Sequence, residues 1–130
     1  MDESGTSSKK KILIIDDEPT LLMIIERRLT SSGFEVISAA QGQEGIEKAL
    51  KEKPDLILLD VMMSGMDGYQ VLKILKVTPA TANIRIVMFT AGVDPKGREK
   101  SMHLGADDYI NKSLPFEDVL QKIRMLLYES

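Results

Sequence analysis

Three carboxylates, a hydroxyl and an ammonium each stand beside the end of a short apolar run in this sequence: Asp16, Asp17, Asp60, Thr90 and Lys112. Taken singly, an aspartate after such a run is commonly a turn or helix-cap residue. Brought together, three carboxylates repel one another unless a cation lies among them, and Mg²⁺ prefers oxygen ligands. A carboxylate can also accept a phosphoryl group. That transfer needs mainly positioning and charge neutralisation, which the ammonium and the hydroxyl would assist.

Five apolar runs predict the β-strands that would position these side chains. The runs are residues 12–15, 36–38, 56–59, 84–89 and 109–110. They are apolar on successive rather than alternate residues, which is typical of parallel strands covered by helices on both faces. Ligands of open α/β sheets bind at the carboxyl ends of the strands. We therefore expect the polar residues to share one edge of the sheet.

Stretches of helical period separate the predicted strands. Pro19 suits a first helical turn, Gly33 suits a C-terminal stop, and Gly97 is an isolated glycine that weakens the fourth helix. The expected helices include residues 21–29, 46–50, 71–75, 95–104 and 116–128. Strict alternation of strand and helix predicts an α/β fold, a (βα)5 doubly wound five-stranded parallel sheet.

The composition excludes several classes of chemistry. The 130-residue chain has no cysteine and one histidine, which excludes disulfides, thiolate zinc sites and multi-histidine metal sites. Its net charge of −3 gives no electrostatic reason to bind nucleic acid, and no apolar run is long enough to span a membrane. We expect a flexible tail over residues 1–10, one domain over residues 11–130, and a cytoplasmic location.

Four motifs stand in fixed order along the chain: IIDDEP at 14–19, LILLDVMMSGMDG at 56–68, VMFTA at 87–91 and GADDYINK at 105–112. Their order, spacing and strand context together resemble the receiver domain of bacterial two-component response regulators, of the kind found in chemotaxis. The resemblance covers residues 10–128. It implies a flavodoxin-like sheet with strand order 2-1-3-4-5.

The resemblance also implies roles for the site residues. Asp60 would accept a phosphoryl group from a sensor histidine kinase or phosphotransfer protein. Asp17, Asp60 and the backbone carbonyl of Met62 would bind Mg²⁺ directly, and Asp16 would act largely through bound water. Lys112 would pair with the phosphoryl oxygens.

Thr90 and Tyr109 would form the switch that the resemblance implies, with Tyr109 swinging inward as Thr90 moves toward the phosphoryl group. The output surface would then comprise the fourth helix, the fifth strand and the fifth helix. A domain of this kind is a phosphoacceptor signalling protein rather than an enzyme. It would be a monomer or a phosphorylation-dependent dimer.

Three residues depart from the family pattern, which usually has proline at each position. Ser113 follows Lys112, and because a cis bond to a non-proline residue costs about 3–4 kcal/mol, we predict a trans Lys112–Ser113 peptide. Ser64 is expected to loosen the loop after Asp60, since proline restricts the chain. Arg85, at the start of the fourth strand, is expected to have only a local effect.

Other functions fit the sequence less well. A pseudo-receiver, an interaction module that is not phosphorylated, is the main alternative, although all five site positions hold competent residue types. An aspartyl phosphatase would need a second acid at position 62, where Met62 stands. His103 is expected on the surface late in the fourth helix, so it does not suit a hydrolase triad. The acidic loop after the first strand disfavours flavin binding.

Overall fold

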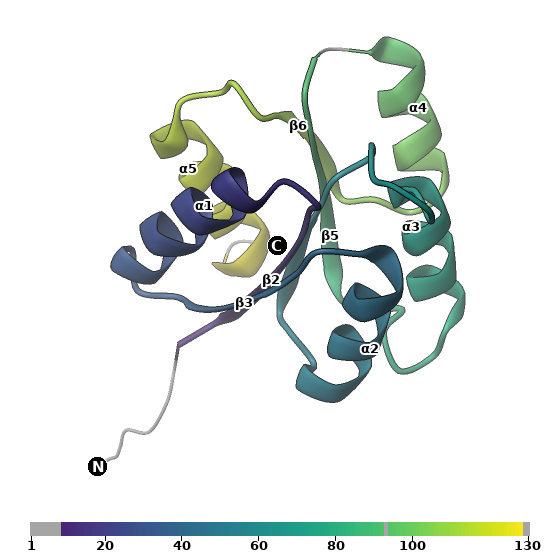
Figure 1. Ribbon diagram of the computed structural model, residues 1–130, viewed down its shortest axis with the longest axis horizontal. Helices are drawn as coiled ribbons and strands as arrows, with labels where there is room; N and C mark the ends of the chain where they lie inside the picture. Colours follow the sequence, from purple (N-terminus) through teal and green to yellow (C-terminus); the bar gives the residue numbers. More distant parts are fainter. Residues whose placement is uncertain (1–8, 93, 129–130) are drawn as a thin grey trace.

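The computed structural model describes residues 9–92 and 94–128, over which five strands and five helices alternate (Figure 1). The strands are β2 (Lys11–Ile15), β3 (Glu35–Ala39), β4 (Leu56–Leu59), β5 (Arg85–Thr90) and β6 (Asp108–Asn111). The helices are α1 (Pro19–Ser31), α2 (Gly42–Glu52), α3 (Gly68–Val77), α4 (Pro95–His103) and α5 (Phe116–Tyr128). The predicted (βα)5 fold is confirmed. Most of the predicted flexible tail, residues 1–8, lies outside the described residues.

The strands form one parallel sheet in the order β3-β2-β4-β5-β6, which confirms the expected 2-1-3-4-5 order. The register pairs Ile15 with Leu59 and Thr90 with Asn111. Because paired strands run in the same direction and end at similar levels, the residues that follow β2, β4 and β6 reach the same edge of the sheet.

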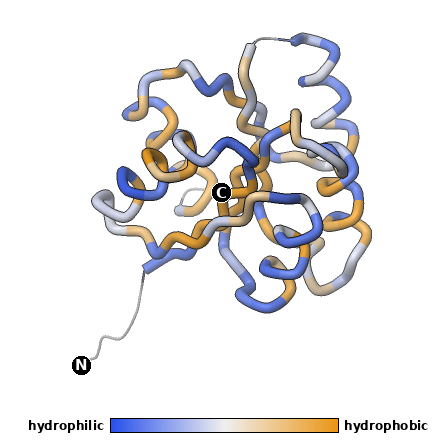
Figure 2. Tube along the Cα trace, in the orientation of Figure 1, coloured by the Kyte–Doolittle hydropathy of each residue, from blue (hydrophilic) through white to orange (hydrophobic). Residues whose placement is uncertain are grey.

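Two hydrophobic clusters cover the two faces of the sheet. In β2, Leu13 and Ile15 point into one cluster, and Ile12 and Ile14 point into the other, because side chains alternate along a strand. Residues of α2 and α3 complete the first cluster, and residues of α1 and α5 complete the second. Figure 1 shows α1 and α5 on one side of the sheet, and Figure 2 shows hydrophobic segments gathered toward the interior. The helices α1, α2, α3 and α5 thus each bury an apolar stripe against the strands, whereas the buried residues of α4 are Gly97 and Ser101.

Burial on both faces is confirmed for the inner strands and is wrong for the two edge strands, β3 and β6. All four residues of β4 are buried, whereas Val36, Ile37 and Ser38 in β3 are half-buried. The edge strands have one neighbouring strand each, so less of their surface is covered. Within the described ranges, 9–92 and 94–128, none of the helices combines the length and apolar character that a membrane crossing requires.

Element boundaries differ from expectation where polar residues begin or end an element. The helices α2 and α3 begin at Gly42 and Gly68, before the first apolar residues that marked them. Thr90 is the last residue of β5 rather than the residue after it. Apolar periodicity does not detect a polar first turn, which is defined by backbone hydrogen bonds and capping.

Candidate functional site

Backbone hydrogen bonds carry the sheet ladder one residue beyond the strands and thereby fix three of the predicted site residues. The N–H of Asp16 donates to Ala39 O at 3.0 Å, and the N–H of Asp60 donates to Ile15 O at 2.9 Å. The N–H of Lys112 donates to Thr90 O at 2.7 Å. These residues are therefore held by the sheet itself rather than by mobile loops.

The Lys112 ammonium joins two of the carboxylates. Its Nζ lies 2.7 Å from Asp16 Oδ2 and 3.4 Å from Asp60 Oδ1. Asp16 is 2% exposed and Asp60 is 4% exposed, so both charges are removed from water. The buried Oδ2 of Asp16 makes an ion pair with Lys112 rather than a well-aligned hydrogen bond, while its Oδ1 accepts from the Glu18 N–H at 2.9 Å.

Asp17 completes a cluster with the chemistry of a divalent-cation site. Ligand oxygens of Asp16, Asp17 and Asp60 all lie within 4.8 Å of one another. Asp17 is the most exposed of the three, and its Oδ2 accepts a hydrogen bond from the Ser64 N–H at 3.0 Å. Carboxylate oxygens are the ligands that Mg²⁺ prefers, so this donor set fits the predicted metal.

The charge balance of the site raises two pKa values. Burial, with the neighbouring charge of Asp16, raises the pKa of Asp60 from 3.8 to about 6, although Lys112 and the Met62 N–H oppose the shift. Burial alone lowers the pKa of Lys112, but its contact with Asp16 and the charges of Asp16 and Asp60 raise that pKa overall. One ammonium is thus too little positive charge for the carboxylates that surround it.

The start of α3 supports the Asp60 backbone, a feature that the sequence interpretation missed. Gly68 donates its N–H to Val61 O at 2.9 Å, and a Cβ at Gly68 would overlap Asp60 O and lie 2.8 Å from Val61 Cα. Asp67 caps the same helix through a reciprocal capping box with Gln70. The Asp-Gly pair at the end of the second motif was the available signal, because such a pair followed by glutamine three residues after the aspartate is typical of a helix start.

The predicted switch residues lie on the two strands beside the acid cluster. Thr90 is 3% exposed at the end of β5, whose register pairs Met88 with Leu59, so Thr90 stands one position beyond the level of Asp60. Tyr109 is half-buried in β6, where its side chain packs against the cluster that includes Leu59 and Met88. Its carbonyl accepts from Arg98 Nη1 at 3.1 Å. The register thus places Thr90 on the strand next to the one that leads to Asp60, and Tyr109 lies toward α4.

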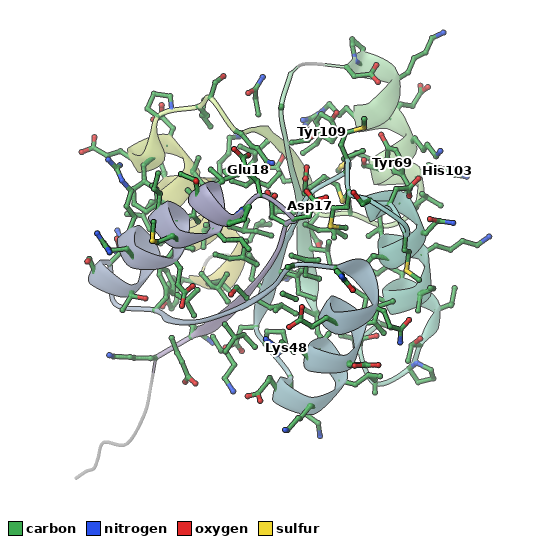
Figure 3. All side chains as sticks on the ribbon, viewed as in Figure 1. Asp17, Glu18, Lys48, Tyr69, His103 and Tyr109 are labelled. Atoms are coloured by element: carbon green, nitrogen blue, oxygen red, sulfur yellow. The ribbon has the colours of Figure 1, made fainter. Side chains whose placement is uncertain are left out.

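The departures from the family pattern have local explanations. No cis peptide occurs among the described residues, which confirms the trans Lys112–Ser113 bond. The Ser113 N–H and Oγ both donate to Asn111 Oδ1 at 2.8 Å, which closes the turn after β6. Ser64 holds Asp17 through its N–H, a donor that proline lacks, so this substitution adds a contact to the loop. His103 is exposed at the end of α4 and apart from Asp17, as predicted (Figure 3).

Comparison with known proteins agrees with this geometry. The family model for the response regulator receiver domain matches residues 12–124. The chain is 42% identical over 96 residues to the response regulator PleD of Caulobacter vibrioides, and 38% identical over 102 residues to the alkaline phosphatase synthesis transcriptional regulatory protein PhoP of Bacillus subtilis. These matches cover 73% and 78% of the chain. The chain spans only 20% and 42% of the length of these two relatives.

Solved structures share the whole fold. The chemotaxis protein CheY4 of Vibrio cholerae superposes with a TM-score of 0.87 at 28% identity, over 92% of this chain and 100% of that one. The BeF3-activated N-terminal receiver domain of RstA from Klebsiella pneumoniae gives a TM-score of 0.86 at 30% identity, over 92% and 99% of the two chains. With the family model matching residues 12–124 and the fold shared over 92% of the chain, this chain belongs to the response regulator receiver domain family.

Proposed function

We propose that this receiver domain accepts a phosphoryl group on Asp60 in a Mg²⁺-dependent reaction. The placement of Lys112 carries the proposal, because its ammonium lies 3.4 Å from the buried carboxylate of Asp60, one oxygen of which lies within 4.8 Å of oxygens of Asp16 and Asp17. A purely structural ion pair would need no third carboxylate at the same point. The proposed domain, residues 11–130, would act as a phosphoacceptor in signalling rather than as an enzyme.

In the proposed reaction, a carboxylate oxygen of Asp60 attacks the phosphorus of a phosphohistidine on a sensor histidine kinase or a phosphotransfer protein. The new P–O bond forms as the P–N bond breaks, and the electron pair of that bond returns to the histidine nitrogen. Asp16, Asp17, Asp60 and the carbonyl of Met62 would hold Mg²⁺, which supplies positive charge that neutralises the transferred group when bound. Lys112 would pair with a phosphoryl oxygen, as its position beside Asp60 allows.

The proposed output begins at Thr90, whose hydroxyl would donate to a phosphoryl oxygen, and continues through Tyr109. The surface of α4, β6 and α5 would carry the signal to a partner. Asp108 of β6 already links these elements through its carboxylate. Its Oδ1 lies 3.8 Å from Arg98 Nη1 of α4, and its Oδ2 lies 3.7 Å from Lys122 Nζ of α5. A movement of β6 would therefore reach both helices.

We propose that the domain works in the cytoplasm, as a monomer or as a phosphorylation-dependent dimer, without binding nucleic acid or membrane itself. The alternative of a receiver fold that is never phosphorylated is not favoured. Its one support was the serine after Lys112, and the trans peptide there leaves the ammonium within 3.4 Å of Asp60.

Acetyl phosphate with Mg²⁺ tests the proposal directly. We expect the wild-type protein to gain one phosphoryl group that is stable in acid and labile in base, measured by intact mass. Asp60→Asn should gain none. Asp118→Asn removes an exposed carboxylate from α5 and is the matched control, which should be labelled like the wild type.

Two results would contradict the proposal. One is a folded wild-type protein that gains no phosphoryl group with Mg²⁺ present. The other is labelling that survives in Asp60→Asn, which would move the acceptor to another residue. Chelation of the metal by EDTA should abolish labelling of the wild type, since the three carboxylates would then repel the incoming phosphoryl group.

A further inference from the structure

Two tyrosine hydroxyls from distant parts of the chain lie beside the same glycine, Gly97. Tyr69 lies in the first turn of α3 and Tyr109 in β6, and Figure 3 shows both on the α4 side of the molecule. A Cβ at Gly97 of α4 would lie 2.8 Å from Tyr69 Oη and 2.9 Å from Tyr109 Oη. Real Cβ atoms do not approach other atoms this closely, so the two hydroxyls fill the place that a side chain at position 97 would take.

This contact explains a residue that is otherwise unfavourable. Gly97 lies within α4, where glycine is a poor helix former, and it is not one of the glycines with positive φ. Its backbone conformation therefore does not require glycine. The buried position and the two nearby hydroxyls supply the reason, because a side chain at position 97 would have to displace both hydroxyls.

Tyr69 is itself fixed in place. Its ring packs against the same hydrophobic cluster as Tyr109, and the Lys100 ammonium lies 4.3 Å from its centroid on the α4 side. Burial raises the pKa of the Tyr69 hydroxyl, with a smaller contribution from Asp94, against a hydrogen bond with Ser101. Burial also raises the pKa of Tyr109, and Tyr69 is the next cause. Packing of its ring thus holds Tyr69 beside Tyr109.

We propose that Tyr69 is a positioning residue for Tyr109, and that Gly97 provides the space that the two hydroxyls occupy. Tyr69 and α4 together then define the inward position of the Tyr109 side chain. The inference deepens the proposed function and rests on it for the switch role of Tyr109. The placement of Tyr109 in the unphosphorylated protein can be tested without that role.

Fluorine NMR of protein labelled with 3-fluorotyrosine tests this placement, because the chain has three tyrosines and no tryptophan. The Tyr109 resonance is assigned with Tyr109→Phe, and its solvent isotope shift between H2O and D2O measures exposure of the ring. We expect Tyr69→Leu and Gly97→Ala to increase the isotope shift of Tyr109. Tyr69→Phe retains the ring and should keep most of the wild-type value.

Gly97→Ala is expected to fold, because alanine favours the helix and the atoms it displaces are the free ends of two side chains.

Two control variants remove groups outside this contact. Tyr128→Phe changes an exposed tyrosine in α5, and Glu99→Ala changes an exposed position of α4. An unchanged Tyr109 isotope shift in both Tyr69→Leu and Gly97→Ala would overturn the proposal, as would an equal change in the controls.

A second measurement separates this inference from the proposed function. Beryllofluoride with Mg²⁺ mimics a phosphorylated carboxylate and should alter the Tyr109 resonance of the wild type. In Gly97→Ala this response should be smaller, because the inward position is obstructed. If beryllofluoride leaves the wild-type Tyr109 unaffected, the switch role fails, whereas the isotope shifts of the unliganded variants still decide whether Tyr69 positions Tyr109.

Discussion

Replacing Asp60 by asparagine should stabilise the metal-free protein at neutral pH. The pKa of Asp60 is raised from 3.8 to about 6 by burial and by the charge of Asp16. One pKa unit corresponds to about 1.4 kcal/mol, so ionisation of Asp60 costs the folded state about 3 kcal/mol. Asparagine keeps the size of the side chain and removes the charge. Lys112 retains Asp16 as a partner at 2.7 Å, so we expect the free energy of unfolding of Asp60→Asn to rise by about 2–3 kcal/mol.

The pH dependence has a definite sign. A raised pKa means that the folded protein holds a proton on Asp60 at pH values where the unfolded chain has lost it. Well below pH 3.8 the Asp60 carboxyl group is protonated in both the folded and the unfolded state, so Asp60→Asn has no advantage in stability over the wild type. As the pH rises through the range from 3.8 to about 6, the wild type loses stability relative to Asp60→Asn, and the full difference is present above that range.

Urea unfolding followed by circular dichroism at pH 4 and pH 7.5 measures this difference. The matched control is Asp118→Asn, which changes the net charge by the same amount at an exposed position. Mg²⁺ at saturating concentration should reduce the difference in unfolding free energy between Asp60→Asn and the wild type, because a bound cation stabilises the wild-type carboxylates. The reasoning would be refuted by a stabilisation that is equal at the two pH values, or by an equal gain in Asp118→Asn.

Substitutions at three further positions test how the site is held. Lys112→Met should destabilise the protein at pH 7.5, in contrast to Asp60→Asn, because Asp16 at 2.7 Å and Asp60 at 3.4 Å lose their cation. Urea unfolding measures the loss of stability, and a gain would contradict the prediction. Gly68→Ala should weaken Mg²⁺ binding and phosphorylation, since the alanine Cβ must displace the Asp60 backbone. Isothermal calorimetry measures Mg²⁺ binding and intact mass measures phosphorylation. Wild-type values of both would contradict the prediction and show that the loop adjusts. Asp67→Ala should cost about 1 kcal/mol of unfolding free energy through loss of the helix cap, whereas Asp67→Asn should retain most of it.

The arrangement of strands and helices followed from the sequence because its cause is local. Continuous apolar runs such as residues 56–59 predict buried parallel strands, and β4 is buried at every residue. The prediction was less accurate at the edge strand β3, since a strand at the edge of a sheet can have the same apolar residues but has fewer neighbours to cover them. The starts of α2 and α3 were also missed, because their first turns are polar.

The sequence by itself determined which residue types stand at the carboxyl ends of the strands, and hence that acids, a hydroxyl and an ammonium share one edge. Tertiary structure decided how they pair. Lys112 lies closer to Asp16 than to Asp60, Ser64 gives its N–H to Asp17, and Gly68 admits α3 against the Asp60 backbone. The contacts of Lys112 and Ser64 join residues far apart in sequence, so no local pattern encodes them. They depend on how closely packed elements approach, a property of the folded chain as a whole.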